Sequence, residues 1–338
     1  MSRETVSFII PMRNAERFLT RALESIISQS YRDFEVICIV NDSSDGCLSI
    51  CNRFAKENPN FVVINTEVPG VGNARNLGLD HATGQYIAFV DADDVIGHDF
   101  LTEITSAMGS TGADVGVCEY VTNATQLGTS ASSAPDSQPS TVESGKYLDA
   151  VLTGHVPDAG AIWGKLFRSE IIDGLKFSTD LKYAEDILFL GSYLARAESV
   201  VTIAYRGYFW DRNTGGVTSI NTKDNTSMLQ TFEAATQLAV QMPEHSKWAT
   251  RVFAFRQANY LLSRGTLDNR ELRKVWTILK QNRREIFEHV SDVRCRYLIL
   301  ALASLSGYYP FRLMLKSARV FRRCLKSSRE AVTHQRTK

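Results

Sequence analysis

The sequence predicts an α/β fold, with a mostly parallel central sheet flanked by helices and a helical extension after it. In the first half of the chain, short apolar runs alternate with segments of helical spacing, which is the order typical of a parallel sheet. These runs carry few polar residues, as expected for strands buried on both faces. From about residue 224 onward the patterns are helical, and Gly and Pro become scarce.

The first half contains predicted strands and helices in alternation. Pro11 ends the first strand, and a helix over 15–27 follows because apolar residues recur there at helical spacing. Gly70 and Gly72 open a later helix that runs through Leu79. The strands are expected at 6–10, 34–40, 61–64 and 86–90, and the remaining helix at 48–55.

The pattern changes after residue 120. Residues 122–141 are rich in Ser, Thr and Ala, which predicts a mobile surface loop. Structure is expected to resume near Val142, with helices at 163–172 and 185–195 and a strand at 200–205. We therefore expect one domain over 1–222, with halves of about 1–120 and 142–222, and a helical region over 223–338.

Composition excludes several classes of protein. The 338 residues carry a net charge of +1, so no overall charge draws the chain to nucleic acid. The six cysteines form no Cys-x-x-Cys pair, which disfavours a zinc site or a disulfide framework. We find no signal-peptide pattern and no apolar run of the ~18 residues that a membrane-spanning helix needs. These features predict a cytoplasmic protein.

Residues 307–338 carry nine Lys or Arg residues and one acidic residue, Glu330. Two interpretations are open. The segment is either a solvated helix face that packs on the protein, or a basic amphipathic helix that makes peripheral contact with the inner face of the plasma membrane. The charge pattern is the same in both cases.

Acidic residues directly follow the run 86–90. Asp91 and Asp93 stand at positions i and i+2, which project to the same side of an extended segment, and Asp94 comes next. Oxygen ligands favour a hard ion such as Mg²⁺ or Mn²⁺, and open α/β sheets bind ligands at the carboxyl ends of their strands. We therefore expect a metal and diphosphate site here. The alternative is a polar turn that caps a helix starting near His98.

Two other segments carry candidate groups. Arg75 lies in the first turn of the helix that Gly70 and Gly72 open, where free N–H groups and a guanidinium suit an anion; an exposed arginine would give the same pattern. Glu185 and Asp186 begin a later helix. Acidic residues there often serve as simple caps, but a carboxylate in a cleft is also a suitable general base.

Seven segments of the first 220 residues match one known family. They are 6–16, 27–35, 41–46, 72–78, 82–94, 163–167 and 185–186. Together they resemble the family-two inverting glycosyltransferases, whose GT-A fold is a Rossmann-like nucleotide-binding domain. The Gln-x-x-Arg-Trp motif of processive members is absent, so the resemblance implies transfer of one sugar per encounter.

The resemblance also implies roles for the donor side. Asp42 would contact the nucleoside base, and Pro11 would frame that pocket. Arg75 would lie near the uracil or the diphosphate. Asp91 would face the ribose and the sugar, and Asp93 would ligate Mn²⁺ or Mg²⁺.

On the acceptor side, Asp186 would be the catalytic base. The implied reaction moves a hexosyl or N-acetylhexosaminyl group from a nucleoside-diphosphate sugar, UDP-linked, to a hydroxyl of a glycan or lipid-linked acceptor with inversion. Bacterial surface polysaccharide or glycoconjugate synthesis is the implied setting.

The chain departs from the family pattern at three positions. Arg13 stands where the family often has Tyr, Asn41 replaces a common Asp, and Gly164 replaces a common Asn. These changes leave the identity of the donor open. Two other functions are alternatives: a sugar-1-phosphate nucleotidyltransferase, although residues 11–14 lack its glycine-rich loop, or a non-catalytic nucleotide-sugar-binding protein.

Overall fold

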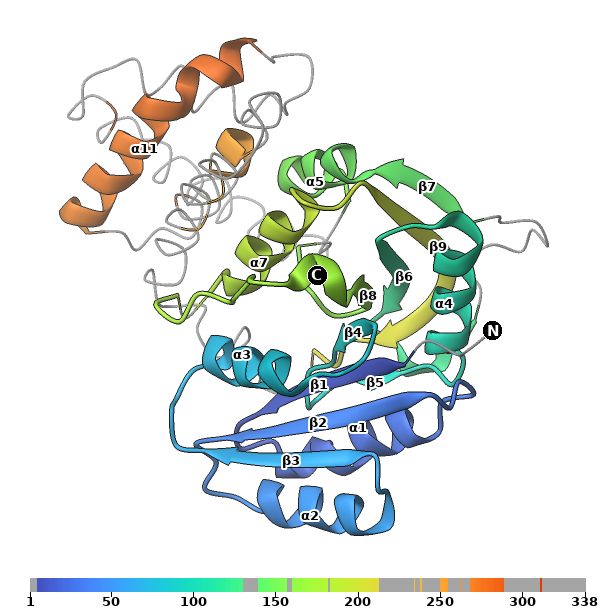
Figure 1. Ribbon diagram of the computed structural model, residues 1–338. Helices are drawn as coiled ribbons and strands as arrows, with labels where there is room; N and C mark the ends of the chain where they lie inside the picture. The colour runs from blue at the N-terminus through green and yellow to red at the C-terminus, as the bar shows by residue number, and fades with distance from the viewer. Residues whose placement is uncertain are drawn as a thin grey trace, which may run out of the picture. The chain divides into compact units, whose positions relative to one another are not determined.

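The computed structural model describes residues 5–129, 139–156, 160–181, 183–212, 250–254 and 268–288, together with Ala234, Leu238, Leu262 and Phe311. The chain forms two compact units (Figure 1). The first comprises Met1–Thr222 and Val240–Met242, and the second comprises Lys223–Ala239 and Pro243–Lys338.

The first unit begins with four parallel strands, as the alternation of apolar runs predicted. In the sheet, β1 lies between β2 and β4, and β3 pairs with β2. Helices join the strands along the chain. The strands are β1 (Val6–Met12), β2 (Phe34–Asn41), β3 (Phe61–Thr66) and β4 (Tyr86–Phe89), and the helices are α1 (Glu16–Ile27), α2 (Cys47–Glu57) and α3 (Val71–His81).

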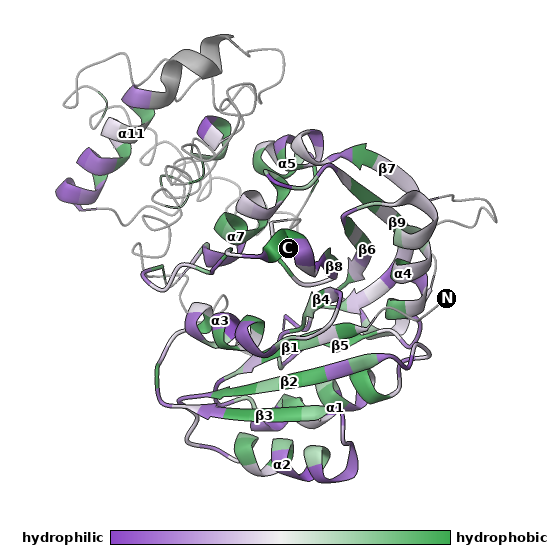
Figure 2. Ribbon diagram, viewed as in Figure 1, coloured by the Kyte–Doolittle hydropathy of each residue, from purple (hydrophilic) through white to green (hydrophobic). Residues whose placement is uncertain are grey.

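Both faces of these strands are covered, and Figure 2 colours β2 and β3 mostly as hydrophobic. Alternate residues of β1, such as Phe8 and Ile10, share a core with α1 and α2. The opposite face packs against α3, where a Cβ added at Gly78 would collide with Ile9 and Ile39. Glycine at this position therefore lets α3 lie close to the sheet, which places Arg75 near the strand ends.

The rest of the sheet mixes parallel and antiparallel pairings. The strand order is β3-β2-β1-β4-β8-β6-β9-β5, with β7 paired to β9. β6 and β9 are parallel, whereas β8 is antiparallel to both of its neighbours. The elements are β5 (Val95–Ile96), α4 (Phe100–Thr111), β6 (Val115–Val121), η1 (Ala124–Gln126), β7 (Ser140–Glu143), α5 (Ser144–Thr153), β8 (Lys165–Arg168), α6 (Ser169–Ile172), α7 (Glu185–Leu194) and β9 (Ser199–Phe209).

The predicted helix over 163–172 was wrong. Lys165–Arg168 forms β8, and only Ser169–Ile172 is helical. The apolar residues Trp163, Leu166 and Phe167 fit helical spacing, but they fit a central strand as well, because such a strand buries both faces. β8 lies between β4 and β6, and pairing with both neighbours outweighs the local pattern.

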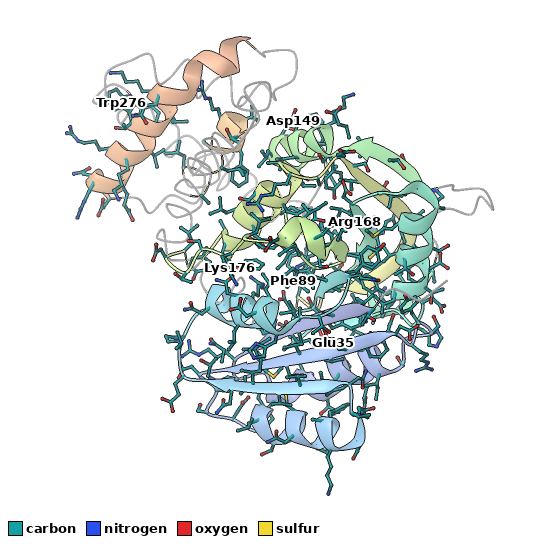
Figure 3. All side chains as sticks on the ribbon, in the orientation of Figure 1. Glu35, Phe89, Asp149, Arg168, Lys176 and Trp276 are labelled. Atoms are coloured by element: carbon teal, nitrogen blue, oxygen red, sulfur yellow. The ribbon has the colours of Figure 1, made fainter. Side chains whose placement is uncertain are left out.

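Phe89, at the end of β4, connects β8 and α7 to the parallel half (Figure 3). Its ring makes edge contacts with Phe167 at 5.9 Å and with Phe189 at 5.7 Å between centroids. It also meets Phe177 at 5.3 Å. This aromatic cluster holds the start of α7 beside the residues that follow β4.

Of the predicted loop over 122–141, the structure describes η1 and the start of β7, and residues 130–138 lie outside the described part.

In the second unit, α11 (Asn269–Glu288) begins with a capping box, in which Asp268 and Glu271 each accept a hydrogen bond from the other's backbone N–H. The basic segment 307–338 is described only at Phe311. None of the helices that the structure describes is long and apolar enough to span a membrane.

Candidate functional site

The acidic motif after β4 is a tight turn, not the extended segment that the sequence predicted. The backbone N–H of Asp94 donates to the carbonyl oxygen of Asp91 at 3.1 Å. Because of this turn, Asp91 keeps a side chain that is 35% exposed, whereas Asp94 is 1% exposed. Asp93 is partly buried between them. The three carboxylates therefore have different surroundings and different capacities to bind a ligand.

Asp94 anchors the turn to the end of β9. Its carboxylate accepts the Tyr208 hydroxyl at 2.7 Å and the backbone N–H of Asp211 at 2.9 Å. The same Tyr208 oxygen accepts the N–H of Asp91 at 3.3 Å. Burial, with a contribution from the Asp91 charge, raises the pKa of Asp94 to about 8. Asp94 thus holds the motif in place with oxygens that are already engaged.

Arg75 of α3 lies at the centre of the candidate site. Its Nη1 donates to Glu185 at 2.6 Å, and its Nη2 lies 3.3 Å from Asp91. Burial opposes the charge, but the carboxylates of Asp91, Glu185 and Asp186 outweigh burial and raise the pKa of Arg75. The guanidinium also stacks over Phe177, and its buried Nε has no hydrogen-bond partner among the described residues. The exposed arginine that the sequence allowed is therefore excluded.

Asp186 enters the site at the first turn of α7. Ala184, the residue directly before α7, has a φ of 65°. This left-handed conformation costs an alanine about 1 kcal/mol and is often found at functional sites. One carboxylate oxygen of Asp186 accepts the N–H of Ile187 at 2.7 Å. Burial raises the pKa of Asp186 to about 7, and the Glu185 charge adds to the effect. Asp186 is therefore poised to exchange a proton near neutral pH.

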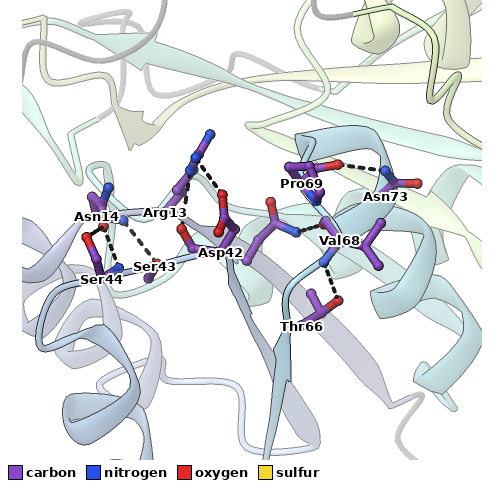
Figure 4. A network of polar contacts seen from close by, with 10 residues as sticks. Arg13, Asn14, Asp42, Ser43, Ser44, Thr66, Val68, Pro69 and Asn73 are labelled. Carbon is purple, nitrogen blue, oxygen red and sulfur yellow. Dashed lines mark hydrogen bonds and ion pairs between the residues drawn. The ribbon is translucent and has the colours of Figure 1, made fainter.

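Asp42 belongs to a second group of contacts, at the ends of β1 and β2 (Figure 4). Asp42 has a φ of 50°, and its carboxylate accepts a hydrogen bond from Nη2 of Arg13 at 2.5 Å. Pro11 is buried in β1 and pairs in register with Ile39. Asn41 donates to the carbonyl oxygen of Val68 at 2.5 Å.

The structure thus brings Arg75, Asp91, Glu185 and Asp186 together, and places Asp42 with Arg13. Sequence patterns did not reveal the contacts of Arg13, Glu185 and Tyr208. Tyr208 was missed because the predicted strand stopped at residue 205, whereas β9 continues to Phe209.

A divalent cation fits this site only together with a ligand. Asp94 is engaged by Tyr208 and Asp211, so protein oxygens for an ion come from Asp91 and Asp93. Within the described residues, no group of three or more His, Cys, Asp or Glu side chains is arranged to hold a metal. Mg²⁺-like ions commonly take one or two carboxylates and complete their shell with substrate phosphates, and the residues here suit that mode.

Residues 7–150 match the sequence model of glycosyl transferase family 2. The chain carries a family 2 glycosyltransferase domain. The putative glycosyltransferase EpsH of Bacillus subtilis is 29% identical over 207 residues, which are 60% of this chain and 59% of EpsH. The poly(ribitol-phosphate) beta-glucosyltransferase of Bacillus spizizenii is 30% identical over 217 residues, which are 62% of this chain and 33% of that protein. The chain therefore spans less than two-thirds of the length of these relatives.

Solved structures show the same fold around the family 2 domain. TarS 1–349 of S. aureus in complex with UDP-GlcNAc matches 94% of this chain and 92% of its own with a TM-score of 0.71 and 21% identity. The complex of the same protein with UDP matches with a TM-score of 0.68 and 20% identity. The expected GT-A fold, a central sheet flanked by helices, is confirmed.

Proposed function

We propose that this protein transfers one sugar per encounter from a nucleoside-diphosphate sugar, UDP-linked, to an acceptor hydroxyl with inversion. The observation that carries the proposal is the position of Arg75. It contacts Asp91 of the acidic turn and Glu185 at the start of α7, so one buried cation connects the two groups of carboxylates. A transfer reaction needs donor and acceptor groups within one site, and this contact supports such an arrangement.

On the donor side, Asp91 faces the ribose and the sugar, and Asp93 ligates Mn²⁺ or Mg²⁺. Such an ion, held by Asp93, would supply Lewis-acid stabilisation of charge on the departing diphosphate. Asp42 and Pro11 contact the nucleoside base, and Arg13 pairs with Asp42 at the same strand ends. Arg75 stabilises the negative charge near the diphosphate and fixes the orientation of Asp91.

On the acceptor side, Asp186 accepts the proton from the hydroxyl that attacks the anomeric carbon. The sugar develops oxocarbenium character as its bond to the diphosphate breaks. Because Asp186 acts as a base and forms no bond to carbon, a single displacement inverts the anomeric centre. Both the raised pKa of Asp186 and its place beside Arg75 support this role.

The relatives support a setting in cell-surface glycan synthesis, with a hexose or N-acetylhexosamine as the transferred sugar. One relative is named a poly(ribitol-phosphate) beta-glucosyltransferase, and TarS has been crystallised with UDP-GlcNAc. We propose a glycan or lipid-linked acceptor and a cytoplasmic location, with the basic segment 307–338 contacting the inner face of the membrane.

The test is a screen of UDP-sugars with the full chain and Mn²⁺, measured as release of UDP. One donor is expected to be turned over, and Asp93→Asn is expected to abolish both turnover and metal-dependent UDP binding. Asp99→Asn is the matched control, because its side chain is 48% exposed and contacts His98. Full turnover by Asp93→Asn would contradict the proposal, and pyrophosphate release from a nucleoside triphosphate would favour a nucleotidyltransferase.

A further inference from the structure

A cavity of about 780 Å³ lies in the first unit, between β6, β7, β9, α5 and the segment that enters β8. Its size is within the range of about 300–1,000 Å³ in which proteins hold small ligands. None of the residues to which we assigned donor or base roles lines it. Its walls include Tyr120, Tyr147, Trp163 and Lys165, together with Glu119 and Thr202.

The aromatic walls are held rigidly. Trp163 stacks on Tyr208 with centroids 4.7 Å apart and planes 11° from parallel. Tyr120 meets the same indole edge-on at 5.2 Å. Rigid aromatic surfaces next to hydrogen-bonding side chains suit a ligand with both apolar faces and hydroxyl groups, which is the character of a sugar ring.

Tyr147 adds a third aromatic ring to the wall. Its side chain is 4% exposed, and its hydroxyl is buried away from solvent. The ring of Tyr147, not its hydroxyl, therefore lines the cavity and adds apolar surface.

The charges around the cavity favour a neutral ligand. Lys146 pairs with Glu143 at 3.4 Å, and Glu119 lies 3.8 Å from Arg206. Lys165 is buried and donates to the carbonyl oxygen of Ala161 at 2.6 Å. Burial also lowers the pKa of Lys165 to about 8, and its amino group is already engaged by the Ala161 carbonyl.

One residue of the cavity wall, Trp163, packs against a residue of the candidate reaction site. Trp163 stacks on Tyr208, whose hydroxyl bonds both Asp94 and the N–H of Asp91. We propose that this cavity binds a neutral sugar unit of the acceptor glycan, next to the unit that receives the transferred sugar. The inference rests on the proposed function, since it assumes a glycan acceptor.

The test measures binding of cellobiose, chitobiose and lactose to the full chain by saturation-transfer NMR, with UDP and Mg²⁺ present. At least one disaccharide is expected to bind. Ala150→Trp fills the cavity and should weaken binding at least tenfold, while Tyr147→Phe keeps the ring that lines the cavity and should leave binding nearly unchanged. Ala195→Trp is the control, since Ala195 is exposed and does not line the cavity, and thermal unfolding checks that each variant folds.

Binding of none of the three disaccharides would overturn the proposal, as would binding that Ala150→Trp leaves unchanged. Cellobiouronic acid keeps both pyranose rings of cellobiose and carries an added negative charge, and tighter binding of cellobiouronic acid would contradict a neutral ligand. UDP titration of the same sample tests the proposed function separately. UDP binding without disaccharide binding would refute the cavity alone, and the reverse result would refute the UDP-dependent reaction.

Discussion

The two halves of the first unit support the candidate site in different ways. Strands β1 to β4 are all parallel, and their carboxyl ends place Asp42 and Asp91 in short turns. In the other half, β8 runs antiparallel to β4 and β6, and the site residues come from the start of α7 and the end of β9. The half that contains β1 to β4, the regular half, supplies the turns that we propose bind the donor. The half that contains β8 and β9, the mixed half, supplies the proposed base and the network that braces the acidic turn.

Arg75 belongs to the regular half but pairs with Glu185 of the mixed half. The site therefore depends on contacts between the halves, namely the Arg75–Glu185 ion pair and the bonds of Tyr208 to Asp94 and Asp91. Loss of the buried ion pair should have the largest effect, and substitutions confined to one half should have smaller ones.

Arg75→Met tests this contact and should be the most damaging change. It leaves Glu185 buried without its ion-pair partner, and breaking a buried pair typically costs about 3–5 kcal/mol of unfolding free energy. Transfer should fall about 10²–10³-fold, as expected when a charge-stabilising group is removed. Urea unfolding and UDP release measure the two effects. Arg75→Lys keeps the charge but loses the forked contacts with Asp91 and Glu185. Wild-type behaviour of Arg75→Met would contradict the role of this residue.

The pH dependence of transfer tests the role of Asp186. As the proposed base, Asp186 acts in its ionised form, and its pKa is raised to about 7. Therefore kcat/KM should rise with pH up to about 7 and then level off. Glu185→Gln removes a neighbouring charge that raises this pKa, so the rising limb should move to lower pH. A flat profile, or a limb that moves to higher pH, would count against Asp186 as the base.

Tyr208→Phe should have a moderate effect, because it loosens the acidic turn without touching a ligand. Asp94 loses one of its two hydrogen bonds and the Asp91 N–H loses its acceptor, at a cost of about 1–3 kcal/mol. UDP affinity with Mn²⁺ should drop about tenfold. Tyr205→Phe is the control on the same strand, since its hydroxyl accepts only the Asp99 N–H among the bonds described here. Equal losses of affinity in both variants would mean that Tyr208 has no special role.

Arg13→Ala should be the mildest change, because it affects an exposed pair in the regular half. The side chains of Arg13 and Asp42 are 58% and 43% exposed, and such surface pairs contribute about 0–1 kcal/mol. The melting temperature should stay nearly constant, while UDP affinity shifts by less than about tenfold. A large loss of stability would show that the pair braces the loop at the ends of β1 and β2.

The two halves also differ in how well their sequence predicted them. The strands over 6–12, 34–41, 61–66 and 86–89 were predictable because apolar runs and helical spacing alternate there without conflict. The segment 163–172 was not, because Trp163, Leu166 and Phe167 satisfy helical and buried-strand patterns alike. Only the pairing of β8 with β4 and β6 decides between them, and that information is not local.

The same distinction applies to the site. Asp91, Asp93 and Asp186 were recognisable from motifs, and their roles stay predictions. The Arg75–Glu185 pair joins residues 110 positions apart, and Tyr208 lies 114 positions from Asp94. No local pattern encodes such contacts, and the turn at Asp91–Asp94 was itself misread as extended, because a motif does not specify its hydrogen bonds.

The most direct test of the central claim is a pair of measurements on Asp186→Asn with Mn²⁺: binding of the UDP-sugar that the wild type uses, and its transfer to acceptor. Asparagine keeps the shape of the side chain but cannot take the proton. The proposed mechanism predicts that donor binding stays within about threefold of the wild type while transfer is abolished. Full transfer by Asp186→Asn would contradict the mechanism.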